Sequence, residues 1–368
     1  MEIKIQRESL INGLYMTQSV IEHRTMMPIL SNARIEAKGK GVSFTATDLQ
    51  VGIIAREPAD VSDAGKVLIP VKNLYDIAKE LQNDMITIKT SPNNWIDVTC
   101  GKSRFKIMGA SADEFPSLPS SEGVEFNIDA KDFCEMIEKV SYAMSNDETR
   151  YTLNGVFLEQ AGTGAKASLR MVATDGHRLS YAERPVKSGK LAKGVIIPKK
   201  GIWELKKILE DVDGDFTLQI GEKTISVVTK NVTFVCRLID GQFPPYNQVI
   251  PKESGRVVSV DRKTLIQALR RAALLANEKS KGVKFNISPG NLDISSSNPD
   301  LGEAKEDISC VYKGETFDVG FNASYFIDIL NVLEDEKSIL ELKNDTSPCV
   351  IRSEFDKGFL SVVMPMRL

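Results

Sequence analysis

Residues 197–209 read IPKKGIWELKKIL, and this stretch decides the fold because its pattern occurs three times in the chain. Residues 69–81 read IPVKNLYDIAKEL, and residues 321–333 read FNASYFIDILNVL. Aligned without a gap, the copies share apolar positions three and four residues apart, which predicts an amphipathic helix with one buried stripe. They also share an acidic position, occupied by Asp76, Glu204 and Asp328. The chain is therefore predicted to contain one structural unit three times.

A second pattern repeats upstream of each of these helices. Ile3, Phe126 and Val258 align at its start, where apolar residues first alternate and then follow helical spacing. This change of period predicts a short strand that runs into a helix. Asp129 and Asp261 stand at two of the junctions, where a carboxylate can cap free backbone N–H groups.

Strands are predicted around both helices of every repeat. Alternating runs lie between the helices at residues 42–46, 167–174 and 291–296, and further runs follow the second helix at residues 85–89, 216–220 and 339–343. Each unit is thus predicted to be an α+β domain in which two helices pack on antiparallel sheets.

Proline- and serine-bearing segments divide the repeats. FPSLPSS occupies residues 115–121 and FPPYNQVIP residues 243–251, so we expect domains at 1–122, 123–250 and 251–368. Proline stiffens such linkers because it fixes φ and favours an extended preceding residue. Three units held at fixed angles form an arc, and an arc whose ends bind each other closes into a ring by two-fold association.

The composition is that of a globular protein, with 42% hydrophobic and 26% charged residues. The net charge of −3 means that any contact with nucleic acid must come from local clusters of Lys and Arg. An odd number of cysteines, no CxxC pair and only two histidines indicate reduced, buried thiols and no metal site; the cysteines are Cys100, Cys134, Cys236, Cys310 and Cys349. Without an apolar run of about 18 residues, a cytoplasmic protein that does not contact membranes is expected.

The middle copy of the repeated helix carries two basic ridges. Lys199 and Lys206 are seven residues apart, as are Lys200 and Lys207, and both pairs lie away from the apolar stripe. These ridges favour contact with an anionic partner, although a charged helix face is also compatible with simple solvation. The third copy, at residues 322–333, has no basic residue.

Five short motifs resemble the bacterial DNA polymerase III β subunits, the replicative sliding clamps. They are PILSN at 28–32, RYTLNG at 150–155, ATDGHRL at 173–179, GFNASY at 320–325 and VVMPMRL at 362–368, and the likeness extends over residues 1–368. The resemblance implies a non-catalytic head-to-tail homodimer that forms a six-domain ring around double-stranded DNA. Such a ring uses no cofactor and is opened by a clamp loader complex. It further implies partners that carry a short Gln/Leu/Phe motif: the DNA polymerase III α subunit, other DNA polymerases and repair proteins.

The same resemblance assigns three sets of residues. The partner-peptide pocket would comprise Leu153, Thr174, Gly176, His177, Arg178, Leu179, Pro244, Val249, Asn322, Tyr325, Thr346, Pro348, Val362, Val363, Met364, Pro365 and Met366. DNA contacts would come from Arg24, Tyr151, Lys199 and Lys200, and the dimer interface from Ile77, Leu81, Phe105, Ile107, Leu274 and Leu275. Related clamps often have Arg where this chain has Gln248, and some have Tyr where it has Thr152.

An enzyme is the alternative interpretation. Asp175 and His177 could form an acid–base pair in a hydrolase or nucleotide-binding enzyme. Asp-Gly is also common turn chemistry, and the aligned residues Asp48, Leu49 and Gln50 contain no histidine. The sequence favours the turn, and with it the clamp.

Overall fold

The computed structural model describes residues 1–21, 27–82, 84–119, 122–162, 164–186, 188–251 and 255–367, without the side chain of residue 165. The chain forms two compact units. The first unit contains Met1–Lys131, Lys187–Leu191 and Lys200–Leu238, and the second unit contains Asp132–Val186, Ala192–Lys199 and Ile239–Leu368. Each unit is described here by itself.

Both repeated patterns form the elements that the sequence predicts. The strand-to-helix pattern appears as β1 (Glu2–Gln6) and α1 (Arg7–Gln18), β10 (Val124–Asp129) and α3 (Ala130–Ser141), and β18 (Arg256–Asp261) and α5 (Arg262–Ala272). The second pattern gives α2 (Val71–Glu80), α4 (Lys199–Leu209) and α6 (Ala323–Val332). Asp261 caps α5 by accepting a hydrogen bond from the Thr264 N–H at 2.8 Å, and Asp129 accepts one from the Lys131 N–H at 2.9 Å.

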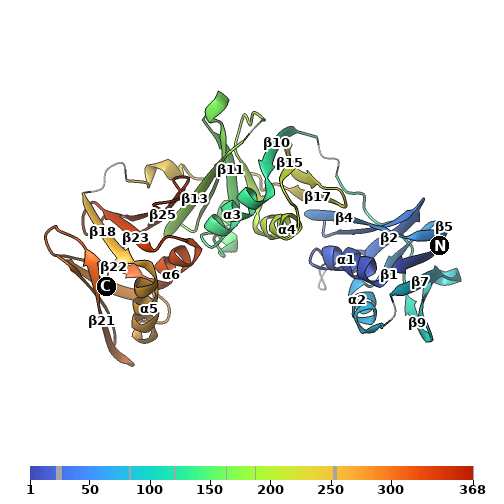
Figure 1. Cartoon of the computed structure of the whole chain (residues 1–368), viewed down its shortest axis with the longest axis horizontal. Helices are drawn as coiled ribbons and strands as arrows, with labels where there is room; N and C mark the ends of the chain where they lie inside the picture. The colour runs from blue at the N-terminus through green and yellow to red at the C-terminus, as the bar shows by residue number, and fades with distance from the viewer. Residues whose placement is uncertain are drawn as a thin grey trace. The chain divides into compact units, whose positions relative to one another are not determined.

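Two antiparallel sheets build the first unit. The five-stranded sheet has the order β5-β1-β7-β8-β9, with β5 at Asp60–Asp63, β7 at Met85–Thr90, β8 at Trp95–Cys100 and β9 at Ser103–Met108. The eight-stranded sheet has the order β10-β15-β16-β17-β4-β3-β2-β6, with β2 at Ala33–Lys38, β3 at Gly41–Thr47, β4 at Val51–Pro58, β6 at Gly65–Ile69, β15 at Asp215–Ile220, β16 at Thr224–Val228 and β17 at Val232–Arg237. Helix α1 packs beside α2 and against β3 and β4 (Figure 1).

One antiparallel sheet runs through the second unit. Its order is β14-β11-β12-β13-β25-β24-β23-β18-β21-β20-β19-β22. The further strands are β11 (Gly155–Ala161), β12 (Ser168–Thr174), β13 (Arg178–Pro185), β14 (Val195–Pro198), β19 (Gly282–Ser288), β20 (Asn291–Asn298), β21 (Gly302–Val311), β22 (Phe317–Asn322), β23 (Lys337–Leu342), β24 (Cys349–Arg352) and β25 (Phe359–Val363). Helices α5 and α6 pack side by side (Figure 1).

Consecutive repeats are joined by backbone pairing inside each unit. In the first unit β17, from the middle repeat, pairs with β4 of the first repeat, and Cys236 lies opposite Val51. In the second unit β25, from the last repeat, pairs with β13 of the middle repeat, and Val363 lies opposite Arg178. The two joins are therefore equivalent ladders of hydrogen bonds.

Burial follows the predicted stripe. Leu74, Ile202 and Phe326, which align in the three copies, have no exposed surface.

Four of the cysteines are buried and Cys134 is half-buried; burial raises the pKa of Cys236 to about 12. No helix in the described ranges is both long and apolar enough to cross a membrane. Among the residues that the structure describes, His, Cys, Asp and Glu side chains form no group of three suited to a metal ion.

Candidate functional site

The turn between β12 and β13 is organised by Asp175. Its Oδ1 accepts hydrogen bonds from the backbone N–H groups of His177, at 2.9 Å, and Arg178, at 3.0 Å. Gly176 has a φ of +88°, a conformation that costs glycine little. The Thr174 hydroxyl donates to the Arg178 carbonyl and accepts from the Gly176 N–H. The Asp175 carboxylate therefore folds a rigid turn.

The first repeat contains the same turn. Oδ1 of Asp48 accepts from the N–H groups of Gln50, at 2.8 Å, and Val51, at 2.6 Å. Leu49 takes the place of the glycine at a φ of +74°. A carboxylate that performs the same backbone role in both copies is explained by folding, so this geometry gives no support to the hydrolytic alternative.

Arg178 ties this turn to the last repeat. Its guanidinium pairs with Asp175 at 3.1 Å and with Asp328 of α6 at 2.6 Å, and it also donates to the Tyr142 carbonyl. The Tyr325 ring lies 4.6 Å from the guanidinium carbon. Only 11% of the Arg178 side chain is exposed, so its role is to hold the turn and α6 together.

The C-terminal segment lies along the same turn. Val362 pairs with Leu179 in the β13–β25 ladder, and beyond the strand the Met364 N–H donates to the His177 carbonyl at 2.9 Å. The Met366 N–H then donates to the Gly320 carbonyl at the same distance. These bonds bring together residues 174–179 and 362–366, both of which contribute to the predicted partner pocket.

A small apolar cluster lies beneath this junction. It joins Val172, Leu179, Tyr246, Val350, Leu360 and Val362, with Phe157, Tyr181, Phe243 and Ile250 packed against it. Of the predicted pocket residues, Leu153, Thr174, Leu179, Val362 and Val363 are buried, Asn322, Tyr325, Pro348, Pro365 and Met366 are half-buried, and Gly176, His177, Pro244, Val249, Thr346 and Met364 are exposed. Pro348 directly precedes Cys349, which pairs with Val363, so it lies close to the exposed Met364.

Tyr246 is a residue of this site that the sequence analysis missed. It belongs to the proline-rich linker, yet its hydroxyl donates to Glu159 at 2.5 Å and accepts from Arg170 at 2.9 Å. Burial, followed by the bond to Glu159, raises the pKa of Tyr246 to about 12. The linker that carries Pro244 and Val249 is thereby anchored to the middle repeat. The sequence did contain a signal for this contact, because an aromatic residue is unexpected between the prolines of a polar linker.

The lysine ridges of α4 make contacts within the chain. Nζ of Lys200 pairs with Asp48 at 2.5 Å and donates to the Val20 carbonyl. Nζ of Lys207 donates to the Tyr15 carbonyl at 2.7 Å and lies 4.1 Å from the centroid of the Tyr15 ring. Contacts within the first unit thus offset part of the charge of these two lysines, and their contact with an outside anion stays a prediction.

The remaining predicted residues are distributed over both units. In the second unit Tyr151 is exposed, and Lys199 donates to the Asn146 side chain at 2.6 Å. The predicted dimer-interface residues fall into two groups. In the first unit, α2 contains Ile77 and is followed by Leu81, and β9 contains Phe105 and Ile107. In the second unit, Leu274 and Leu275 follow α5. Arg24 lies outside the described residues.

Comparisons with known proteins cover the whole chain. Models of the N-terminal, central and C-terminal domains of the DNA polymerase III beta subunit match residues 1–119, 127–245 and 247–367. The chain belongs to the DNA polymerase III beta subunit family.

Relatives in this family include the beta sliding clamps of Pseudomonas putida and Escherichia coli, which are 36% and 33% identical to the chain over 100% of both sequences. The crystal structure of the DNA polymerase sliding clamp from Caulobacter crescentus matches with a TM-score of 0.94 and 32% identity over 100% of both chains. The predictions of three clamp domains, an α+β fold and a DNA sliding clamp are confirmed. Such clamps are non-catalytic processivity factors that act on DNA with partner proteins.

Proposed function

We propose that two copies of this chain close head-to-tail into a six-domain ring around double-stranded DNA. In the cytoplasm, as part of the DNA polymerase III holoenzyme, the ring tethers the α subunit, other DNA polymerases and repair proteins after a clamp loader complex has placed it. The observation that carries this proposal is the repeated join, β4 with β17 and β13 with β25.

A third join of the same kind needs a second chain. By position in the repeat, β21 corresponds to β4 and β13, and β9 corresponds to β17 and β25. Strand β9 ends its sheet, and among described strands residues 303–308 of β21 pair only with β20. Free edges of this kind are templates for pairing with another chain. The edges are also complementary in net charge, with Arg104 and Lys106 on β9 and three acidic residues, Glu303, Glu306 and Asp307, against one lysine, Lys305, on β21.

Interaction with DNA is proposed to be weak and electrostatic. Lys199 and Tyr151 lie near one loop of the second unit, where the Lys199 N–H donates to the Asn154 carbonyl at 3.1 Å. We assign DNA contact to these two residues, to Arg24 and to Lys200, whose charge Asp48 partly offsets. Tight phosphate contacts would oppose sliding, so affinity for linear duplex should be low and strongly dependent on salt.

The partner site is proposed to be the surface formed by the 174–179 turn, the linker and the C-terminal segment. Val249 and Met364 are exposed apolar residues on the segments that contribute Tyr246 and Val362 to the buried apolar cluster, an arrangement that suits a short hydrophobic peptide. Methionine is flexible and adapts to different side chains, an advantage where several partners share one site.

Solution mass and retention on DNA test this proposal together. The wild-type chain should have twice the mass of one chain at micromolar concentration, and L274E/L275E should halve it, because two buried charges would oppose the join. Loaded wild-type clamp should remain on nicked circular DNA and leave when the circle is cut. A wild-type monomer, or equal retention on circular and linear DNA, would contradict encirclement.

A further inference from the structure

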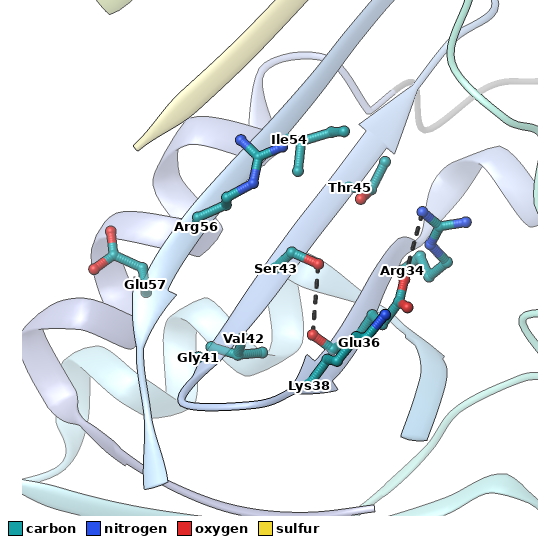
Figure 2. A pocket seen from close by; sticks show the side chains of 10 residues that line it. All are labelled: Arg34, Glu36, Lys38, Gly41, Val42, Ser43, Thr45, Ile54, Arg56 and Glu57. Atoms are coloured by element: carbon teal, nitrogen blue, oxygen red, sulfur yellow. Dashed lines mark hydrogen bonds and ion pairs between the residues drawn. The ribbon is translucent and has the colours of Figure 1, made fainter. Parts of the chain in front are cut away.

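A cavity of about 380 Å³ lies on the first-repeat part of the eight-stranded sheet, over β2, β3 and β4 (Figure 2). Phe44 of β3 points to the opposite face, where its ring lies beside Gly13 of α1. Ser43 and Thr45 alternate with Phe44 along the strand and line the cavity. None of the residues assigned above to DNA, partners or dimerisation belongs to it.

Two polar atoms at this cavity have no partner within the described part of the chain. They are Oγ1 of Thr45, a residue that is 1% exposed, and Nε of Arg34. Arg34 lies directly opposite Thr45 in the pairing of β2 with β3, so both atoms belong to one end of the cavity. Native proteins satisfy nearly all buried polar atoms, and a neighbouring pair of exceptions indicates a place where another molecule supplies the acceptor.

The cavity is electropositive. Three basic residues, Arg34, Lys38 and Arg56, line it with two carboxylates, and one of these, Glu36, lies 3.8 Å from Arg34. Glu57 also borders it, but hydrogen-bonds to Ser9 of α1. Figure 2 shows Arg34 and Arg56 on opposite sides of Ser43 and Thr45. A ligand between them therefore meets two guanidinium groups.

The guanidinium of Arg34 is held in place before any ligand arrives. Its central carbon lies 5.7 Å from the centroid of the Phe115 ring, which belongs to the linker after the first repeat. Glu36 lies 3.8 Å from the Nη2 atom, beyond hydrogen-bond distance, and the Nε–H on the same edge has no acceptor among the described residues. Planar guanidinium edges match planar carboxylates in two-point contacts. Ile54 faces Thr45 across the β3–β4 ladder and adds an aliphatic wall.

We infer that this cavity binds a carboxylate carried on a short aliphatic chain, as in a glutamate side chain or a small dicarboxylic acid. The carboxylate accepts hydrogen bonds from the Arg34 Nε–H and the Thr45 hydroxyl, and the aliphatic chain packs on Ile54. Glu36 disfavours phosphate, which places up to two negative charges on one group, more than a carboxylate group, which carries one. The inference is independent of the ring proposed above.

Methyl-resolved NMR of the full chain in its native assembly tests the inference, with glutarate as the probe. Glutarate should shift the Ile54 Cδ1 methyl signal saturably with a dissociation constant on the order of millimolar, as expected for one small anion. T45V keeps the shape of the side chain and removes only the hydroxyl, and R34K keeps the charge and removes the Nε–H. Each should weaken binding at least about tenfold, the loss of one hydrogen bond to a charged group.

R352K provides the matched control, because Arg352 is also a strand arginine beside a glutamate, Glu341 at 3.2 Å, but it belongs to β24 in the second unit and does not line the cavity. It should leave the glutarate affinity unchanged. A matched concentration of NaCl should not reproduce the shift. The inference is overturned if glutarate gives no saturable shift, if T45V and R34K bind it as wild type does, if NaCl reproduces the shift, or if inorganic phosphate binds more tightly than glutarate.

Discussion

Replacing Met364 by alanine should weaken the binding of a partner peptide by a predictable amount. Met364 keeps its backbone bond to His177, and 37% of its surface is exposed beside the buried cluster. Full burial of a methionine side chain is worth about 1.5–3 kcal/mol, so covering the exposed part is worth about 0.5–1 kcal/mol. The loss corresponds to a roughly two- to fivefold rise in the dissociation constant.

Calorimetric titration with a peptide that carries Gln, Leu and Phe measures this change. Wild-type affinity should be roughly micromolar, since the peptide pays for being ordered when it binds. M85A is the matched control, because Met85 is 43% exposed but starts β7 in the first unit. If M364A binds as wild type does, or if M85A weakens binding equally, the partner site lies elsewhere.

Two further predictions concern charge. Burial alone would raise the pKa of Asp356, but hydrogen bonds from Arg184 and Lys139 hold that pKa below its usual range. The ionised Asp356 carboxylate therefore stabilises the fold at neutral pH, and this contribution is lost as the pH falls below about 4. The urea midpoint of wild type should therefore fall more between pH 5 and pH 3 than that of D356N; parallel slopes would refute this. K199A should reduce the slope of log affinity for duplex DNA against log salt by about one, whereas K313A, at an exposed site in the last repeat, should not change it.

The repeated helices could be predicted because each encodes its own period. The stripe through Leu74, Ile202 and Phe326 depends on local spacing, and the Asp175 turn depends on residues within three positions. Such local signals survive in a single sequence. The pairing of β17 with β4 could not be predicted, because short alternating runs specify a strand but not its neighbour.

Ion pairs between residues that are far apart in the chain also could not be predicted from the sequence. The sequence shows that Lys200 lies on a basic ridge, but not that Asp48, 152 residues earlier, comes within 2.5 Å of it. The acidic position shared by the three repeated helices marks contacts between neighbouring repeats. Glu204 accepts from Ser19 in the first unit and Asp328 pairs with Arg178 in the second, so this position serves both internal joins.

The equivalence of the strand joins has a consequence for how a closed ring responds to dilution. The strands of the β4–β17 and β13–β25 joins belong to one polypeptide, so a broken ladder finds its partner again at an effective concentration set by the chain, of order millimolar for a short tether. A β9–β21 join between two molecules has no such tether. The rate at which it re-forms is proportional to the protein concentration and therefore falls on dilution. In the proposed ring, the join between two molecules is therefore the one that stays open at low protein concentration.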